Sequence, residues 1–136
     1  MTKRNADIQT FKPKWPDFTL LPADQMRYTY DRPSDTLFVD FYGTARAAAS
    51  VPLDRGDRDY LYLRVDPETD AVVGLQIEYF LSYVVEQHPD LAGALDVATL
   101  VDIGDDDLDR ITRIRSGRAP GGDPATLIEE LRRLSA

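Results

Sequence analysis

Two short acidic segments carry the residue types best suited to polar chemistry. Residues 31–35 read DRPSD and residues 66–70 read DPETD. Each segment has aspartate at both ends, a proline, and a hydroxyl residue directly before the second aspartate. Proline presets the backbone φ of a turn, and Asp, Ser and Thr side chains bond to nearby backbone amides. The pattern predicts two hairpin turns. The alternative is a carboxylate site for a hard cation, formed by Asp31, Asp35, Asp66 and Asp70.

The densest group of acids lies further along the chain. It comprises Asp102, Asp105, Asp106, Asp107 and Asp109. The group lacks the alternating ligands, central glycine and terminal glutamate of an EF-hand loop. Acidic side chains also stabilise the N-terminus of a helix. We therefore predict a helix start here and no metal ligand.

Four arginines follow these acids. They are Arg110, Arg113, Arg115 and Arg118. Guanidinium groups in such a cluster could bind an anion or the acidic surface of a partner. The alternative is a solvated helix face that neutralises the neighbouring aspartates.

Catalytic motifs are not found in the sequence. His88 is the single histidine, and no nucleophile and orienting acid accompany it in a recognisable pattern. The chain has no phosphate loop, dinucleotide fingerprint or Gly-x-Ser-x-Gly elbow. We predict no catalytic residue and no cofactor, which favours a protein that is not an enzyme.

Composition narrows the class of protein further. A length of 136 residues suits one domain, and 43% hydrophobic residues suffice for a core. The chain has no cysteine, which excludes disulfides and thiolate zinc sites. The net charge of −8 disfavours direct nucleic-acid binding. We see no signal peptide and no membrane span, so we expect a cytoplasmic protein without membrane contact.

Hydrophobic periodicity predicts an α+β fold. Alternation with period two indicates an antiparallel β-meander of about five strands, followed by C-terminal helices. The expected strands are 26–30, 36–42, 50–53, 60–65 and 72–78, and the expected helices are 79–88, 105–116 and 123–136. We divide the chain into an extended N-terminal arm (1–25), an α+β domain (26–118), a linker (119–122) and a C-terminal amphipathic helix (123–136). Apolar residues in the arm predict that it lies on the domain and buries Phe11, Trp15, Phe18, Leu20 and Leu21.

The predicted sheet has apolar residues on both faces. One face is aliphatic, as in Leu37 and Val39, and explains the core. The second face is expected to be aromatic, with Tyr28, Phe38, Tyr42, Tyr60 and Tyr62 as its members. A sheet that is apolar on both faces needs cover on both. That cover could be the chain itself, a second subunit, because tyrosine is enriched at interfaces, or a small ligand.

About fifty residues, 28–77, resemble a small prokaryotic family, domain-of-unknown-function family 2283. Its opening Tyr-Asp-turn-Asp-x-Leu-Tyr-Val pattern is matched by residues 30–39, YDRPSDTLFV. Its closing Asp-turn-Val-Val-Gly-Ile-Glu-Ile pattern is matched by residues 66–77, with Leu75 and Gln76 in place of the usual Ile and Glu. The resemblance implies a compact β-meander with an α element and no assigned catalytic residue. Proteins of this kind are often suspected to be partners in two-protein modules such as toxin–antitoxin pairs.

Together these features favour a non-enzymatic protein–protein interaction module. Its partner would be a second copy of the chain, in a homodimer, or a basic protein that this acidic chain binds, as an antitoxin would by analogy. The alternatives are a metal-assisted or carboxylate-based enzyme and a small-ligand-binding domain.

Overall fold

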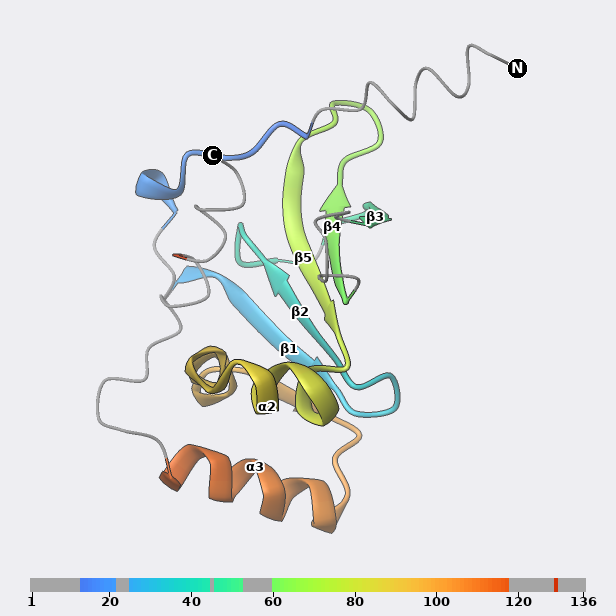
Figure 1. Cartoon of the computed structure of the whole chain (residues 1–136). Coiled ribbons are helices and arrows are strands. Elements are labelled where there is room, and N and C mark those ends of the chain that lie inside the picture. The colour runs from blue at the N-terminus through green and yellow to red at the C-terminus, as the bar shows by residue number, and fades with distance from the viewer. Residues whose placement is uncertain (1–12, 22–24, 45, 53–59, 118–128, 130–136) are drawn as a thin grey trace.

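The computed structural model describes residues 13–21, 25–44, 46–52, 60–117 and 129. These residues form a mixed α+β structure built on a six-stranded sheet (Figure 1). The strands are β1 (Arg27–Asp31), β2 (Thr36–Asp40), β3 (Ala49–Pro52), β4 (Leu61–Val65), β5 (Val72–Glu78) and β6 (Thr99–Val101). Five of them correspond to the expected strands, whereas β6 was not predicted.

The strands lie in the order β3-β4-β5-β2-β1-β6. All neighbours are antiparallel except β1 and β6, which are parallel. The prediction of an α+β fold is therefore confirmed, but the prediction of an antiparallel meander is wrong. β5 lies between β4 and β2, so the chain crosses the sheet on its way from β2 to β3. Alternation reveals which residues of a strand share a face, but it does not specify which strands are neighbours.

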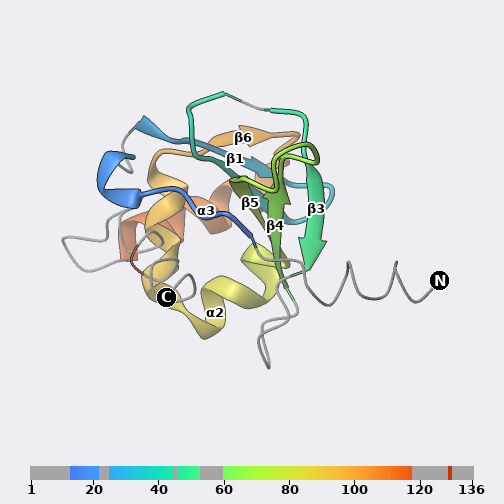
Figure 2. The same ribbon diagram turned by 90° about the horizontal axis from the view of Figure 1, so that it is seen from above.

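Helical segments after β5 cover one face of the sheet (Figures 1 and 2). A π-helical turn at Phe80–Val84 continues into α2 (Val85–Gln87), and a 3₁₀ helix follows at Pro89–Asp96. The break at His88 agrees with the expectation that Pro89 cannot continue the preceding helix. After β6 the chain forms α3 (Asp105–Gly117), close to the expected helix at 105–116.

The hydrophobic core lies between these helices and the face of the sheet beneath them, which we call the covered face. Cross-strand register places Tyr30 opposite Leu37, and Leu37 opposite Ile77. Tyr28 and Val39 form the next pair along the same face. The helical segments contribute the buried side chains Phe80, Leu81, Val84, Leu95 and Ile111. The covered face therefore accounts for most of the apolar burial that stabilises the fold.

The described part of the N-terminal arm packs on the domain. Backbone hydrogen bonds join Lys14 to Asp70 and Val72, and a short 3₁₀ helix forms at Phe18–Leu20. Phe18 is buried, and its ring lies edge-on to Phe41 with 5.4 Å between centroids. Trp15 and Leu21 are partly buried against the core, whereas Leu20 is 76% exposed, contrary to our expectation. Phe11 lies outside the described residues.

Three other expectations fall mainly outside the described part of the chain. They concern Arg118, the linker 119–122 and the helix 123–136, of which only Glu129 is described. Among the described helices, none is both long and apolar enough to cross a membrane.

Candidate functional site

Both acidic segments form hairpin turns. In the first turn, the backbone N–H and the hydroxyl of Ser34 donate to the Asp31 carboxylate. In the second turn, the Glu68 N–H donates to the Asp66 carboxylate at 2.9 Å. The closing residues Asp35 and Asp70 have φ values of +50° and +62°, a left-handed conformation that aspartate tolerates better than most residues. The repeated sequence thus produces a repeated turn.

Asp35 has a further role that the sequence did not reveal. Its carboxylate accepts hydrogen bonds from the backbone N–H groups of Leu81 and Ser82, at 2.9 and 3.2 Å, and from the Ser82 hydroxyl at 2.6 Å. Its backbone carbonyl accepts from the Phe80 N–H at 2.9 Å. Asp35 therefore caps the helical segment that begins at Phe80, because the first N–H groups of a helix have no partner within it. The residue before that segment, Tyr79, makes no side-chain capping bond.

Tyr30 completes this network from the covered face. Its hydroxyl donates to Asp35 Oδ1 at 2.7 Å. Burial, followed by the hydrogen bond to Asp35, raises the pKa of Tyr30 well above its ordinary value, so the ring stays neutral. All the donors around the Asp35 carboxylate thus come from the chain itself, and both carboxylate oxygens are occupied.

Neighbouring charges form ion pairs over the same helical segment. The Arg32 guanidinium pairs with Asp107, and Arg110 donates to the Leu81 carbonyl at 2.5 Å and to Glu86 at 2.8 Å. The predicted arginine cluster is therefore divided. Arg110 is engaged within the molecule, Arg113 is exposed on α3, and the side chain of Arg115 lies outside the described set, as does Arg118.

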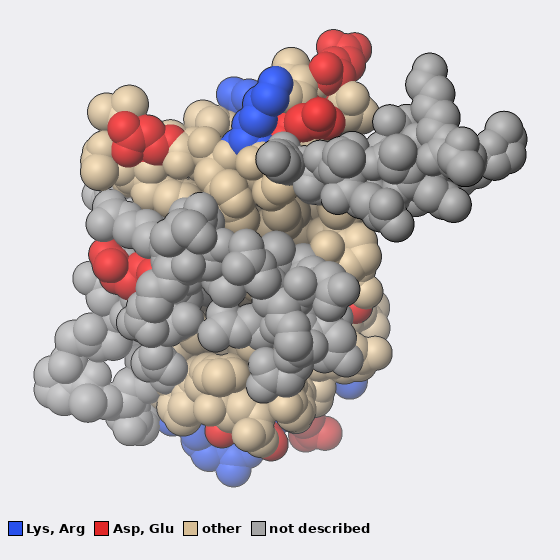
Figure 3. All heavy atoms as spheres, turned by 45° about the horizontal axis from the view of Figure 1, so that its top comes forward, with Lys and Arg blue, Asp and Glu red and all other residues tan. Residues whose placement is uncertain are grey.

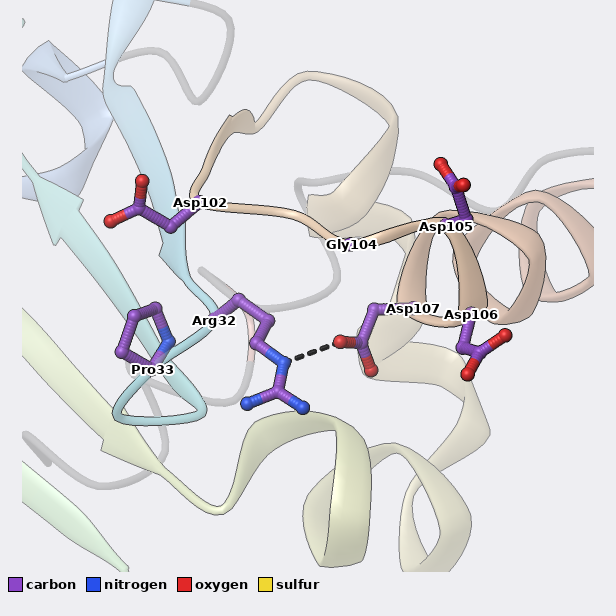
Figure 4. Close-up of a pocket in the computed structure, with 7 residues that line it drawn as sticks. All are labelled: Arg32, Pro33, Asp102, Gly104, Asp105, Asp106 and Asp107. Carbon is purple, nitrogen blue, oxygen red and sulfur yellow. Dashed lines mark hydrogen bonds and ion pairs between the residues drawn. The ribbon is translucent and has the colours of Figure 1, made fainter.

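Four of the five predicted acids, Asp102, Asp105, Asp106 and Asp107, line a hollow of about 620 Å³ beside Arg32, whereas Asp109 is exposed on α3 and does not line it (Figure 4). Asp107 points toward Arg32, whereas Asp105 and Asp106 point away from it. Within the described residues, no group of three His, Asp or Glu side chains is arranged to hold a metal ion. Asp105, Asp106 and Asp107 lie in the first turn of α3, where acids stabilise a helix, as predicted.

The five predicted members of the aromatic face do not share one face. Tyr28 is buried on the covered face, opposite Val39. Tyr60 is also buried, with its ring centroid 6.0 Å from Tyr83 and 6.4 Å from His88 on the helical side. The sequence pattern correctly showed which residues of β1 share a face. Which face of the sheet these residues point to depends on the pairing of β1 with its partner strand.

The opposite side of the sheet, which we call the open face, is more polar than expected. We define it by the side chains of Arg27, Thr29, Phe38, Asp40, Tyr62 and Arg64. One row across the strands joins Arg27, Asp40, Gly74 and Arg64, and the next joins Thr29, Phe38, Gln76 and Tyr62. Phe38 and Tyr62 are half-buried, and Tyr42, just after β2, is 40% exposed.

The connection from β2 to β3 runs on this side of the sheet, away from the helices (Figure 2). It carries Arg46, whose guanidinium lies 4.3 Å from the centroid of the Tyr42 ring. Arg64 donates to the Arg46 carbonyl at 3.5 Å, and its guanidinium lies 5.7 Å from the centroid of Phe38. The chain thus covers part of the open face with its own crossover connection and adds an arginine to it.

A depression of about 370 Å³ remains open on this face. Its lining residues are Arg27, Thr29, Phe38, Asp40 and Arg64. Two of them, Arg27 and Arg64, bring positive charge to a chain whose net charge is −8. An aromatic ring and arginines in one depression can together accept an apolar group and an anion.

Asp40 is the unusual member of this depression. The residue is only 7% exposed, yet no described residue donates a hydrogen bond to its carboxylate or forms a close ion pair with it. Burial raises the pKa of Asp40, and the more distant Arg64 and Arg27 oppose that rise. Buried polar groups in folded proteins nearly always have a partner. Asp40 therefore marks the open face as a candidate binding site.

The sequence contains a signal for this site. Asp40 stands between Val39 and Phe41, and Arg64 between Leu63 and Val65, each a charge within an apolar strand. Only the sheet register shows that the two side chains project from the same face, on either side of Gly74.

The acidic side chains are the second feature of the surface charge. In the space-filling view, the described Asp and Glu side chains lie in separate groups rather than in one patch (Figure 3). The described acidic side chains on that side therefore do not gather into a single surface for a basic partner.

Comparison with known proteins found no relative of this chain. No protein-family model, curated protein or solved structure matches the chain. The resemblance to domain-of-unknown-function family 2283 thus depends on the quoted residues alone and stays a prediction.

Proposed function

We propose that this protein is a non-enzymatic protein–protein interaction module and that the open face of its sheet is the binding surface. The observation that carries the proposal is the pairing of partly exposed aromatic rings with arginines on that face. Phe38 and Tyr62 lie there with Arg27 and Arg64, and Tyr42, just after β2, contacts Arg46 of the crossover connection. Tyr and Arg are enriched at the energetic centres of protein interfaces.

Charge favours a different protein over a second copy as the partner. A homodimer that joined two open faces about a two-fold axis would bring the arginines of one copy toward those of the other. Like charges at an interface oppose association. A partner with acidic side chains would instead complement Arg27, Arg46 and Arg64. The partner proposed here is therefore acidic over the contact, although this chain is itself acidic overall.

The enzymatic alternative receives less support from the same geometry. The Asp35 carboxylate caps a helix and already accepts four hydrogen bonds, including that from Tyr30. The Asp31 carboxylate accepts from Ser34, and that of Asp66 accepts from Glu68. These aspartates therefore have structural roles: Asp31 and Asp66 stabilise turns, and Asp35 caps a helix.

A photo-crosslinking experiment tests the proposed surface. We would place a benzoylphenylalanine at Tyr42, on the side of the open face, and at Tyr83, on the helical side, as the matched control. The two tyrosines are similarly exposed, at 40% and 48%. After irradiation in the native organism, we expect a protein adduct from position 42 and none from position 83. The captured protein, once purified, should bind the isolated chain.

Two results would contradict the proposal. One is equal labelling from the two positions, and the other is no protein adduct from position 42. An adduct of twice the chain mass would identify a homodimer and would overturn the choice of an acidic partner.

A further inference from the structure

We propose that the depression between Arg27 and Arg64 receives an acidic side chain from an extended segment of the partner protein, next to an aromatic residue of that segment. This inference rests on the proposed function and specifies the chemistry of its partner. It starts from the depression on the open face, which is lined by two arginines, a hydroxyl, an aromatic ring and a buried carboxylate.

The two arginines have capacity for an anion. Arg27 is exposed, and no described acidic side chain forms a close ion pair with it. Arg64 makes one long hydrogen bond, to the Arg46 carbonyl at 3.5 Å, and lies over Phe38. A guanidinium has five N–H donors in a planar fork that matches a carboxylate. Most donors of these two arginines are therefore available to a ligand.

Asp40 does not neutralise them by direct contact. It lies opposite Arg27 in the sheet register and is separated from Arg64 by Gly74, but it forms no close ion pair with either. Two guanidinium groups and one carboxylate leave an excess of one positive charge in the depression. The expected ligand is consequently an anion rather than a cation.

Asp40 also requires a donor from the ligand. Its carboxylate is buried without a hydrogen-bond donor in the described chain, which is costly for a polar group. An amino-acid residue in an extended segment supplies a backbone N–H close to its own side chain. An acidic residue can thus give a backbone donor to Asp40 and a side-chain carboxylate to the arginines.

Phe38 is the reason why we propose an aromatic residue next to the acidic residue of the partner segment. Phe38 is half-buried and lines the depression from the central strand β2. A partner ring could stack on it or meet it edge-on, within reach of the Arg64 guanidinium.

The shape of the depression favours a protein segment over a small molecule. Its volume of about 370 Å³ is open to solvent. Sites for small molecules usually bury most of the ligand surface. An open depression contacts one side of its ligand, as happens when a side chain enters from a larger partner surface.

Peptide titrations followed by NMR test the inference. The probe is acetyl-Phe-Asp-amide, and its isosteric control is acetyl-Phe-Asn-amide. We expect the Asp peptide to shift the amide signals of Thr29, Phe38 and Arg64 and to bind about tenfold more tightly than the Asn peptide, because charge-assisted hydrogen bonds are lost with the carboxylate. A third peptide, acetyl-Ala-Asp-amide, should bind more weakly than the first, because it lacks the ring.

Variants of the protein locate the site. We expect Arg64→Ala and Arg27→Ala each to weaken binding of the Asp peptide, whereas Arg113→Ala, on α3, should leave it unchanged. Arg64→Lys retains the charge but not the planar fork, so it should give an intermediate affinity and shows the effect even if the alanine variant folds poorly.

Three outcomes would overturn the inference: equal affinity for the Asp and Asn peptides, shifts confined to the helices, or undiminished binding by the Arg27 and Arg64 variants. If position 42 still crosslinks a partner, only the acidic–aromatic inference is lost and the proposed function stands. If that crosslink is also missing, both are lost.

Discussion

Two aspartates at the opposite ends of β2 have contrasting environments. Asp35 precedes the strand, and its carboxylate accepts four hydrogen bonds from Tyr30, Leu81 and Ser82. Asp40 ends the strand and is buried, yet no described donor reaches its carboxylate. The first carboxylate lies beneath the helical segment, and the second lies in the depression of the open face.

This difference distinguishes a carboxylate that stabilises the fold from a buried carboxylate that no described donor reaches. A buried carboxylate with a full set of donors stabilises the structure, because each donor would otherwise lack a partner. A buried carboxylate without donors lowers stability and needs another reason to be present. We therefore expect the two aspartates to respond to mutation with opposite signs.

The largest effect is expected at Asp35. Asp35→Ala removes the cap of the helical segment and the acceptor of the Tyr30 hydroxyl, and it places alanine at a positive φ. We expect the free energy of unfolding to fall by about 4 kcal/mol. Urea unfolding, followed by Trp15 fluorescence and far-UV circular dichroism, measures this loss of stability.

Asp70→Ala is the matched control for this change. Asp70 closes the other hairpin turn with a similar φ, but no helix begins above its carboxylate. Its replacement should cost about 1 kcal/mol, through the backbone conformation alone. Equal losses in the two variants would show that the cap contributes nothing to stability.

Gly74, which faces Asp40 from β5, should give the next largest effect. A Cβ atom at this position would lie 2.4 Å from the Val39 carbonyl oxygen, in the backbone of β2. We expect Gly74→Ala to destabilise the protein by about 3 kcal/mol, because the two central strands must separate to admit the methyl group. Thermal or urea unfolding provides the measurement.

Gly104 offers a control of the same residue type. A Cβ built there meets no atom within 4 Å, so Gly104→Ala should change stability by less than about 0.5 kcal/mol. If Gly74→Ala were equally harmless, the close approach of β2 and β5 at the floor of the open face would be incorrect.

A smaller effect than at Asp35 or Gly74 is expected at Asp40, and its sign is reversed. Burial raises the pKa of Asp40 in the folded protein above its unfolded value. Between these two pKa values the folded state binds more protons, so the free energy of unfolding decreases as the pH rises. Asp40→Asn removes that cost, and we expect it to stabilise the protein by up to about 1 kcal/mol near neutral pH.

The pH dependence makes this prediction specific. The advantage of the Asn variant should shrink as the pH falls through the folded pKa of Asp40, and it should disappear below about pH 3.9, where aspartate is protonated in both states. Urea unfolding of the two proteins across this range measures the difference. A wild type that is more stable than the variant at neutral pH would mean that Asp40 has a favourable partner.

Local features of the fold were predictable from residue type and spacing. Proline and paired Asp and Ser or Thr residues specified the two turns, because their preferences act within five residues. Pro89 specified the end of the helical segment before it, and acids at 105–107 marked the start of α3. Alternation located five strands and identified Leu37 and Val39 as core residues.

Other features required contacts between distant segments. The capping of Leu81 and Ser82 by Asp35 spans more than forty residues, so no local pattern could show it. The orientation of Tyr28 depended on its register with Val39. The insertion of β5 between β4 and β2 depended on which edges paired, and this arrangement placed Arg64 on the same face as Asp40, on the other side of Gly74.

The sequence by itself thus determined the turns, most of the helices and strands, and the aliphatic half of the core. Conformational propensity and hydrophobic periodicity depend on residues that are near one another in the chain, so they can be read from the sequence. Only the tertiary structure decided the strand order, the composition of the open face and the contrast between Asp35 and Asp40. The physical reason is that hydrogen-bond satisfaction and burial are properties of a neighbourhood in space. The same residue type, at two ends of one strand, caps a helix in one neighbourhood and lies without a described donor in the other.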